Sequence, residues 1–362
     1  MKVLHTEWST GWGGQEIRIL AEMRGVRTRG VDVMIAARPG AKVLPAARKE
    51  GFRTFEIPFR RSLDPGSIWR LFQLIRAEGI DVVNTHSGKD TWNGGLAAKL
   101  AGARFVRTRH LYFTPKPGQI LFINRWADFV ITTGEVLRER MIADSRVKPD
   151  RIASIPTGQD PGKYDATRYD RAAGRRELGI APQQVAVGML AMFRAVKGTD
   201  IYLRMAEQLQ ARHPGAVFLI AGDGPQSAEI NDFIASRKLE ARIRRVGYLA
   251  DTAPYLAALD VFVLPSLMEG LPQVLIQALM MGRACVSTEV GSVRDLYQDN
   301  FLIVPPGDEP ALLAAVERLV TDRALAARFE AGARASVVGR FSYDRMIDDV
   351  MAAYRRLAPN AA

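Results

Sequence analysis

Residues 261–279 read VFVLPSLMEGLPQVLIQAL. The apolar VFVL predicts a buried strand, the residues after it a loop, and the residues from Pro272 a helix, since proline is favoured in the first turn of a helix. The loop places the carboxylate of Glu269 where the strand ends and the helix begins. The first N–H groups of a helix have no partner within it, so Glu269 and these groups are expected to face one crevice. With Gln277 on the turn behind, the pattern suits a ligand that carries hydroxyl and phosphate groups.

The same alternation of apolar runs and amphipathic stretches continues on both sides of this segment. The runs that resemble buried strands are 3–6, 31–36, 82–85, 105–108, 129–132 and 152–155, then 185–190, 217–221, 243–247, 261–265, 285–288 and 301–304. Continuous apolar strands separated by helices are typical of parallel sheets with helices on both faces. Ligands of such sheets bind outside the carboxyl ends of the strands. We therefore expect an α/β protein whose functional loops follow its strands.

The chain length and one break in this rhythm indicate two domains. At 362 residues the chain exceeds the roughly 100 to 200 residues that one domain usually holds. Glycine, proline and charged residues dominate residues 157–182, where we place an interdomain linker. We predict doubly wound, parallel-sheet domains at residues 1–165 and 166–340, with a cleft between them. The tail, 308–357, has a helical pattern that breaks at 339–342.

Positive charge is concentrated in the first half of the chain. Residues 1–160 hold 26 Lys and Arg against 16 Asp and Glu, whereas residues 161–362 hold 24 against 23. A cationic face suits nucleic acid, anionic lipid headgroups or a phosphorylated substrate, and charge alone does not choose among them. The sequence has no zinc-finger spacing, aromatic RNA-binding signature or basic DNA-reading helix. We therefore expect no nucleic-acid partner.

The sequence also indicates a cellular compartment. No apolar run approaches the ~20 residues that span a bilayer, and residues 1–5 lead into a predicted strand rather than a signal peptide. We expect a cytoplasmic protein. The single cysteine, Cys285, lies in an apolar run, which predicts a buried small side chain rather than a disulfide.

One basic, aromatic segment is a candidate for membrane contact. Residues 60–76 combine Trp69 and Phe72 with four arginines, Arg60, Arg61, Arg70 and Arg76. Such a segment can lie against anionic headgroups on the cytoplasmic face of the inner membrane. The alternative is a helix that covers the sheet, whose apolar stripe is Ile68, Leu71, Leu74 and Ile75. We favour a core-facing stripe and keep the arginines as candidate lipid contacts.

Glycine-rich or basic turns follow several other predicted strands. These turns are 9–16, 193–198, 221–225 and 247–248. At Gly13 and Gly14 the missing Cβ lets backbone N–H groups approach a phosphate, although the turn could also simply be tight. Arg194 and Lys197 can neutralise a diphosphate without a metal, with a solvated basic loop as the alternative. Because the carboxyl ends of parallel strands share one rim, we favour a ligand site.

Two histidines, His86 and His110, stand at the ends of predicted first-domain strands. Their spacing is not that of metal ligands, and no cysteine or carboxylate cluster joins them, so we do not expect zinc. His86 suits a structural hydrogen bond as well as a ligand contact. His110, which follows Arg107 and Arg109, favours a substrate role. The other two histidines, His5 and His213, are expected to be structural or solvent-facing.

In combination and order these motifs resemble those of the retaining GT-B glycosyltransferases of family 4, which use nucleotide-diphosphate sugars and no metal. The segments that carry the resemblance are 13–16, 81–86, 107–110, 194–198, 221–225 and above all 260–278, with Gly282 and Gly291. The resemblance runs along nearly the whole chain. It implies two Rossmann-like domains facing across a cleft, with the acceptor mostly on the first, the nucleotide-sugar donor mostly on the second, and a final helix, 341–362, returning to the first.

The resemblance also implies roles for individual residues. Arg194 and Lys197 would stabilise the departing diphosphate electrostatically. Glu269 would accept hydrogen bonds from the donor sugar, and His110 would lie near the anomeric centre. The further donor contacts would be Gly13, Gly14, Gly222, Asp223, Tyr248, Gly270, Leu271, Pro272, Gln273 and Gln277, and the acceptor contacts Glu16, His86, Arg107 and Arg109. No cofactor or metal is expected.

The sequence departs from the family pattern at Gln277, where the family has a second glutamate that accepts from both ribose hydroxyls. An amide supplies one acceptor oxygen and adds a donor, so ribose can still be held, at a loss of ~1 kcal/mol if one charged hydrogen bond becomes neutral. Because this residue would bind the nucleotide and take no part in the reaction, a glutamine at this position does not imply an inactive enzyme.

The function we predict is sugar transfer, with retention, from a UDP- or GDP-sugar to a lipopolysaccharide core or other cell-surface glycan. One alternative is a soluble glycosyltransferase that acts on a small sugar phosphate or metabolite. Another is a noncatalytic nucleotide-sugar-binding or membrane-binding protein. We expect peripheral association with the cytoplasmic face of the membrane through the basic first domain.

Overall fold

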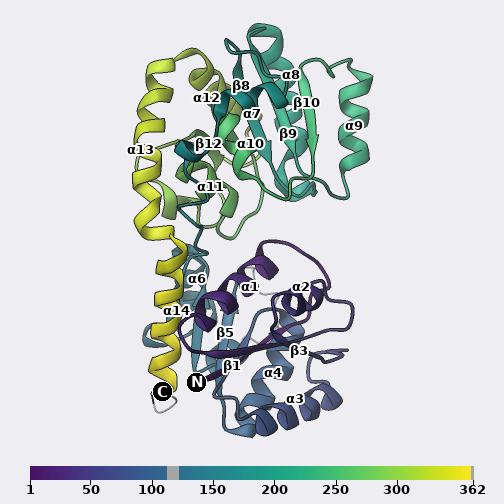
Figure 1. Cartoon of the computed structure of the whole chain (residues 1–362), viewed down its shortest axis with the longest axis vertical. Coiled ribbons are helices and arrows are strands. Elements are labelled where there is room, and N and C mark those ends of the chain that lie inside the picture. The colour runs from purple at the N-terminus through teal and green to yellow at the C-terminus, as the bar shows by residue number, and fades with distance from the viewer. Residues whose placement is uncertain (112–121, 360–362) are drawn as a thin grey trace. The chain divides into compact units, whose positions relative to one another are not determined.

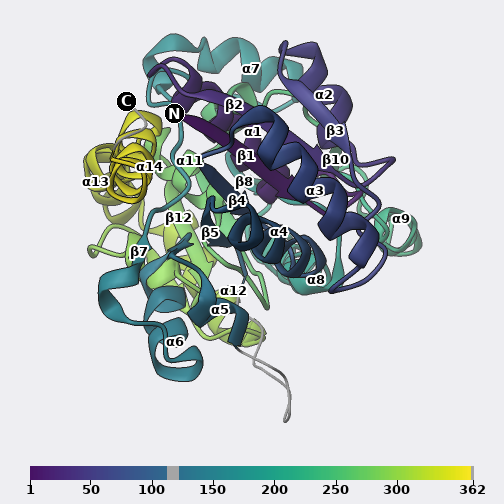
Figure 2. The same cartoon turned by 90° about the horizontal axis from the view of Figure 1, so that it is seen from below.

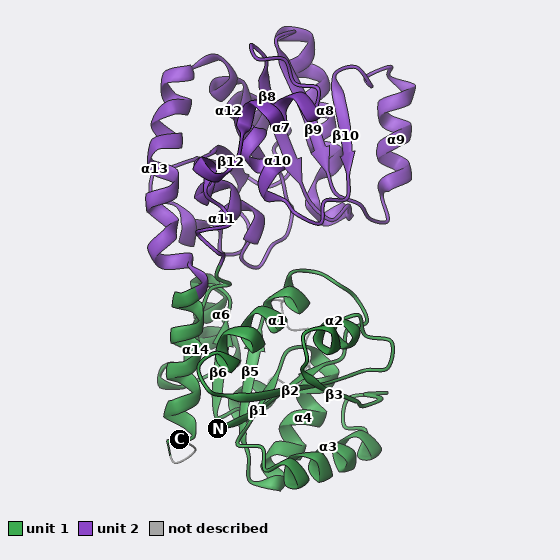
Figure 3. Cartoon of the chain, viewed as in Figure 1, with its two compact units in different colours: residues 1–158, 344–362 green, residues 159–343 purple. Residues whose placement is uncertain are grey.

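The computed structural model describes residues 1–111 and 122–359. The chain forms two compact units (Figure 3), unit 1 from residues 1–158 and 344–362, and unit 2 from residues 159–343. Each unit is built on one parallel sheet with helices along it (Figure 1). This is the α/β class that the alternating apolar runs predict.

The sheet of unit 1 has seven strands in the order β3-β2-β1-β4-β5-β6-β7. The strands are β1 (Lys2–Glu7), β2 (Asp32–Ala37), β3 (Arg53–Glu56), β4 (Val82–Thr85), β5 (Arg104–Arg109), β6 (Phe129–Thr132) and β7 (Ile152–Ser154). All except β3 were predicted. The sequence of β3, RTFE, contains one apolar residue, because this edge strand pairs only with β2 and is partly exposed on both faces.

Among the described residues, seven α-helices accompany this sheet. They are α1 (Gly14–Arg27), α2 (Val43–Lys49), α3 (Pro65–Glu78), α4 (Gly88–Ala101), α5 (Phe122–Trp126), α6 (Glu135–Ser145) and α14 (Tyr343–Leu357). Figure 2 shows α3 and α4 side by side. Ser342 has an extended conformation and separates the last helix, α14, from the helix before it. Helix α14 packs on unit 1, where the hydroxyl of Tyr354 donates to Glu22 at 2.6 Å. The predicted return of the last helix is confirmed.

The sheet of unit 2 has six strands in the order β10-β9-β8-β11-β12-β13. The strands are β8 (Val185–Leu190), β9 (Ala216–Ala221), β10 (Ile243–Gly247), β11 (Val261–Leu264), β12 (Ala284–Thr288) and β13 (Leu302–Val304). The helices are α7 (Arg171–Glu177), α8 (Thr199–Arg212), α9 (Ser227–Ser236), α10 (Ala253–Ala258), α11 (Gln273–Met280), α12 (Glu309–Thr321) and α13 (Arg323–Phe341). All six strands were predicted, to within a residue at each end. Cys285 is fully buried in β12, as expected.

The prediction that residues 157–182 form an interdomain linker is largely wrong. From Gln159 on it belongs to unit 2. Tyr164 is 6% exposed and Ile180 3%, and both pack in the core of that unit. The helix α7 lies within the stretch. The glycines and prolines of this stretch therefore belong to a segment that packs on unit 2, not to a flexible linker.

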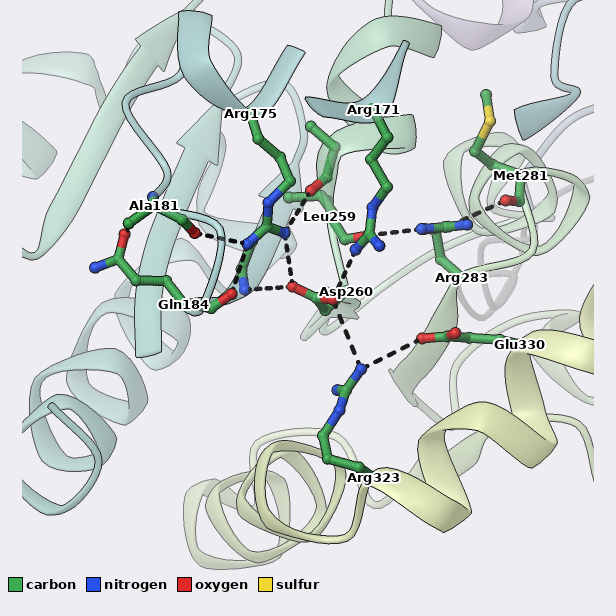
Figure 4. Close-up of polar contacts among 12 residues, drawn as sticks. Arg171, Arg175, Ala181, Gln184, Leu259, Asp260, Met281, Arg283, Arg323 and Glu330 are labelled. Carbon is green, nitrogen blue, oxygen red and sulfur yellow. Dashed lines mark hydrogen bonds and ion pairs between the residues drawn. The ribbon is translucent and has the colours of Figure 1, made fainter. Parts of the chain in front are cut away.

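A cluster of arginines ties this connection to the sheet of unit 2 (Figure 4). Its centre is Asp260, 7% exposed at the start of β11. Asp260 accepts from Arg171 at 2.6 Å and from Arg175 at 2.9 Å, both on α7. The backbone N–H of Ala186 donates to the same carboxylate at 2.7 Å. Burial alone would raise the pKa of Asp260, but these hydrogen bonds and charges hold it below its ordinary value.

The helix α3 keeps the predicted division between core and solvent. Leu71 and Ile75 are buried, whereas Trp69 is 59% exposed and stacks on Phe72. The four candidate arginines, Arg60, Arg61, Arg70 and Arg76, are exposed. Among the described residues, none of the helices has the length and apolarity needed to cross a bilayer.

Candidate active site

The loop between β11 and α11 presents Glu269 as predicted, beside a lysine from another loop. The side chain of Glu269 is 9% exposed. Its Oε1 accepts from Lys197 Nζ at 2.6 Å and from the hydroxyl of Ser266 at 2.7 Å. Helix α11 starts at Gln273, with Pro272 at the N-cap. The carboxylate, the ammonium group and the helix N-terminus therefore belong to one set of adjoining loops.

Glycines allow these loops to approach so closely. At Gly198, which has a positive φ of 63°, a Cβ would collide with the carbonyl of Pro265. At Gly291, a Cβ would collide with the carbonyls of Glu269 and Gly270. A side chain at either position would force the facing backbone segments apart, so we expect it to disturb the contact between Lys197 and Glu269.

The loops after β8, β9 and β10 are joined in a similar way. Gly222 has a φ of 130°, and a Cβ there would collide with the carbonyl of Ala191. Its N–H donates to the carbonyl of Gly247 at 2.8 Å, and Asp223 accepts from the N–H of Phe193 at 2.9 Å through its carbonyl. The structure thus brings the predicted residues of these loops onto one rim of the sheet.

A cation and an aromatic ring are among the side chains on this rim that are open to solvent. Arg194 is exposed, and no acidic residue in the described part of the chain pairs with it. Tyr248 is 70% exposed, which is unusual for so large an aromatic side chain. A guanidinium and an aromatic ring are therefore presented to solvent at this rim of the sheet.

Gln277 lies in a network that uses both halves of its amide. Its Nε2 donates to Oε1 of Gln159 at 2.8 Å, and its Oε1 accepts from the hydroxyl of Thr252 at 3.3 Å. Gln159 in turn donates to Gln273 at 3.3 Å. A glutamate could not donate to Gln159, so the amide fits its surroundings. The carbonyl oxygen of Gln277 has a second lone pair for a ligand.

In unit 1, three histidines form a hydrogen-bonded row, in which His5 lies within β1 while His86 and His110 directly follow the neighbouring strands β4 and β5. His5 Nδ1 lies 2.9 Å from His86 Nε2, and His86 Nδ1 lies 3.0 Å from His110 Nε2. His5 is fully buried and His86 is 3% exposed. Burial lowers the pKa of all three imidazoles, and for His86 and His110 the pKa falls well below 6.5. Within residues 1–111 and 122–359, no three His, Cys, Asp or Glu side chains gather to hold a metal ion.

A buried carboxylate that sequence analysis missed lies under the glycine-rich loop. Glu7, the last residue of β1, is fully buried and accepts from the N–H of Ser9 at 2.6 Å. Its two oxygens also accept from the hydroxyl of Ser87 and the amide of Gln15. Burial and the nearby charge of Asp90 raise the pKa of Glu7. The sequence feature that could have identified Glu7 is a carboxylate at the end of an apolar strand.

The remaining predicted residues of unit 1 lie close to these groups. Glu16 is 5% exposed, and its Oε2 accepts from the N–H of Gly13 at 2.8 Å, a capping-box contact at the start of α1. Arg107 is 6% exposed and donates to Asn124, and burial lowers its pKa. Arg109 is half-buried at the end of β5. Glu16 and Arg107 therefore have structural contacts that the sequence alone did not reveal.

The raised pKa of Glu7 predicts how stability depends on pH. Folded Glu7 keeps its proton at pH values where the unfolded carboxyl, with an ordinary pKa of 4.5, has lost it. Its contribution to the unfolding free energy therefore falls as pH rises, by ~1.4 kcal/mol per unit. Between pH 5.5 and 7, the wild type should lose about 2 kcal/mol relative to the Glu7→Gln variant.

Urea unfolding of both proteins at the two pH values measures this difference. The histidine contributions are common to both proteins and cancel in it. A difference that does not change with pH would show that Glu7 ionises normally in the folded protein.

Two family models match consecutive parts of the chain. One, described as Glycosyltransferase Family 4, matches residues 12–163, and the other, described as Glycosyl transferases group 1, matches residues 181–322. The chain is a group 1 glycosyltransferase of family 4. Together the two models account for most of both units.

Individual relatives of this glycosyltransferase agree with the family models. An Escherichia coli protein named UDP-Gal:alpha-D-GlcNAc-diphosphoundecaprenol alpha-1,3-galactosyltransferase is 25% identical over 313 residues, 82% of this chain and 81% of that protein. The 2-deoxystreptamine N-acetyl-D-glucosaminyltransferase of Streptomyces fradiae is 26% identical and covers 94% of this chain and 92% of its own.

Solved structures share the fold. The crystal structure of HepE from Anabaena with UDP superposes with a TM-score of 0.87, covers 98% of this chain and 100% of its own, and is 20% identical. A glycosyltransferase from Rickettsia africae also gives 0.87, at 20% identity and 99% coverage of both chains. With two parallel-sheet units, this glycosyltransferase has the GT-B fold.

Proposed function

We propose that this glycosyltransferase transfers a sugar, with retention of configuration and without a metal, from a UDP- or GDP-sugar to a cell-surface glycan such as a lipopolysaccharide core or a lipid-linked precursor. The observation that carries the proposal is the ion pair of Glu269, in the loop before α11, with Lys197, whose own loop also carries the exposed Arg194. These loops combine an acceptor for sugar hydroxyls with donors for phosphate.

The donor side follows from the charge that develops in the reaction. As the glycosidic bond breaks, negative charge grows on the departing diphosphate. Arg194 and Lys197 would stabilise it, together with the N–H groups at the start of α11. Glu269 would accept from the sugar hydroxyls. The backbone from Gly270 to Gln273 would complete this subsite.

The nucleotide side would use the rest of the same rim. The ribose would bind the carbonyl oxygen of Gln277. The turn at Gly222 and Asp223, with the exposed ring of Tyr248, would hold the base. An aromatic face stacks on any base, which is compatible with either a UDP- or a GDP-sugar.

Unit 1 would bind the acceptor. The candidates at the carboxyl edge of its sheet are His86, His110, Arg107, Arg109 and Glu16, and the backbone at Gly13 and Gly14 would contact the phosphates of the donor. His110 is partly exposed and follows β5 directly, so we assign it to the reacting end of the substrates. The name of the E. coli relative describes a diphosphoundecaprenol acceptor, which supports a lipid-linked substrate here.

The proposal is tested by assaying release of nucleoside diphosphate from a panel of UDP-, GDP-, ADP- and CMP-sugars, with and without extracted glycolipid and with EDTA present. We expect turnover with a UDP- or GDP-sugar, stimulation by glycolipid and no loss with EDTA. Stimulation by small sugar phosphates instead would favour the soluble alternative. An absence of turnover with every donor, together with donor binding, would favour the noncatalytic one.

Replacing Gln277 by glutamate should strengthen donor binding. A carboxylate can accept charge-assisted hydrogen bonds from both ribose hydroxyls, a gain of about 1 kcal/mol, or roughly fivefold in the Kd for UDP. The loss of the hydrogen bond to Gln159 can be relieved by a flip of that amide. Calorimetric titration with UDP measures the effect, and Gln183→Glu, on the exposed surface of unit 2, is the control. Unchanged affinity would remove Gln277 from the ribose subsite.

Membrane association should depend on the exposed basic segment around α3. Reversing Arg60 and Arg61 to glutamate should reduce sedimentation with phosphatidylglycerol vesicles about tenfold or more, since each basic residue near an anionic surface contributes about 1 kcal/mol. The charge-matched control replaces Lys148 and Arg151 by glutamate. Both residues are exposed in unit 1 and are distant in sequence from residues 60–76. Equal loss in both variants would show that net charge rather than this segment is responsible.

A further inference from the structure

The row of His5, His86 and His110 restricts where their protons can be. In each pair the two facing nitrogens are 2.9 or 3.0 Å apart, so one must carry a proton and the other a lone pair. The rings of His5 and His86 are 13° from parallel with centroids 5.2 Å apart, which suits an in-line hydrogen bond rather than face-to-face stacking. A neutral imidazole has one N–H and one bare nitrogen. If His86 donates to one neighbour, it must accept from the other.

A row of three neutral rings therefore has only two consistent arrangements. In one, every proton points towards His5, so that His110 carries its proton on Nε2 and His5 carries one on its own Nε2. In the other, every proton points towards His110, and the Nε2 of His5 is bare. The two arrangements give His110 opposite tautomers.

The group at the inner end of the row selects between them. Among the described residues His5 Nε2 is buried without a hydrogen-bond partner, and Oε1 of Glu22 lies 3.9 Å from it. Donors surround Glu22: the hydroxyl of Tyr354 lies at 2.6 Å and the amide of Asn84 at 3.2 Å. Arg18 Nε lies 3.9 Å from Oε2. Such surroundings suit a carboxylate, which attracts an N–H of His5 and repels a bare nitrogen.

We propose that Glu22, through His5 and His86, fixes the tautomer of His110, so that its Nε2–H donates inwards and its Nδ1 remains a hydrogen-bond acceptor for a substrate hydroxyl. His5, His86 and Glu22 are then positioning residues that act through His110. The role of Nδ1 as an acceptor for a substrate hydroxyl rests on the proposed function, whereas the assignment of the tautomer does not. No other described residue bonds to Nδ1 of His110.

The charged groups around the row favour the neutral rings that the argument requires. Arg18 on α1 and Arg109 on β5 lower the pKa of His110 further, after burial. Glu22 opposes this effect at His5, where burial nevertheless dominates. Asp90 on α4 accepts from the backbone N–H of His86 rather than from its ring. The row also joins α14 to the candidate active site, because Tyr354 holds Glu22.

The test is nitrogen NMR of the full-length protein with ¹⁵N-labelled histidine at pH 7, which distinguishes protonated from bare ring nitrogens. We expect His110, His86 and His5 to be neutral with the proton on Nε2. His213, which pairs with Glu317 at the surface, serves as an internal reference. A proton on Nδ1 of His110, or a doubly protonated His110, would overturn the proposal whatever the activity.

A Glu22→Gln variant tests the anchor. Removing the charge should give His110 mixed tautomers, and kcat should fall about tenfold, as expected for one misdirected hydrogen bond in the transition state. The control is Asp348→Asn, which makes the same chemical change at the Arg29–Asp348 pair between α14 and the turn after α1. An unchanged His110 spectrum in Glu22→Gln would contradict the proposal.

A second variant guards against loss of folding. Tyr354→Phe keeps the ring packed but removes the hydroxyl that holds Glu22, and it should shift the same His110 signals in part. If Glu22→Gln unfolds the protein, an unaltered spectrum in Tyr354→Phe overturns the role of the anchor. If the wild type shows the expected tautomers but transfers no sugar, the proposed function fails while the tautomer assignment stands.

Discussion

Replacing Glu269 by glutamine is expected to lower kcat/KM for the sugar donor about 100-fold, the cost of one to two charged hydrogen bonds in the transition state. The amide oxygen can still accept from Ser266 and Lys197. The amide nitrogen then takes the place of the carboxylate oxygen that accepted from a sugar hydroxyl. Its N–H group faces that hydroxyl and cannot accept a hydrogen bond from it. Lys197 also loses the negative partner that positions it at 2.6 Å.

The assay is donor turnover at saturating acceptor, with UDP binding measured separately by calorimetry. UDP lacks the sugar, so its affinity should change much less than turnover. Glu289→Gln removes a carboxylate paired with Arg294 at the surface close by in the chain, and it should leave both values unchanged. Full activity in Glu269→Gln would remove Glu269 from the sugar subsite and with it the observation on which the proposed function rests.

Glu269 could be found in the sequence because its setting is local. An apolar run, a loop and a proline at the helix start lie within one short segment, so the position of the carboxylate follows from neighbouring residues. The partner of Glu269 is another matter. Lys197 is 72 residues away, and the contact depends on Gly198 packing against the carbonyl of Pro265. The sequence predicted both residues but not their ion pair.

The histidine row shows what periodicity cannot provide. His5 lies within a strand, and its partner His86 follows β4, although β2 and β3 come between them in the chain. The contact exists because the strand order places β1 beside β4 and β4 beside β5. Alternating apolar runs predict that strands are parallel but not which strands are neighbours. Glu7 was missed for the same reason, since its partners Gln15 and Ser87 come from two different helix starts.

Replacing Asp260 by asparagine is expected to lower the unfolding free energy of unit 2 by about 3 to 5 kcal/mol, the usual cost of breaking a buried ion pair on one side. Arg175, whose side chain is 9% exposed, would keep its charge without the carboxylate that balances it. Arg283 is also 9% exposed and donates to the carbonyls of Met281 and Leu259, so it adds a second buried positive charge that the Asp260 carboxylate would no longer balance (Figure 4). The asparagine would moreover turn an N–H towards one of the arginines or towards the N–H of Ala186.

Urea unfolding monitored by hydrogen exchange in β8 and β11 measures this effect within unit 2. Asp299→Asn, which removes an exposed partner of Arg328, should cost less than about 0.5 kcal/mol. The pKa of Asp260 is lowered in the folded protein, so its contribution is present above the ordinary value of 3.8 and is lost as pH falls below it. The gap between wild type and variant should therefore narrow in acid. A gap below 1 kcal/mol at neutral pH would mean that water screens the cluster despite its burial, and that packing alone holds α7 against β11.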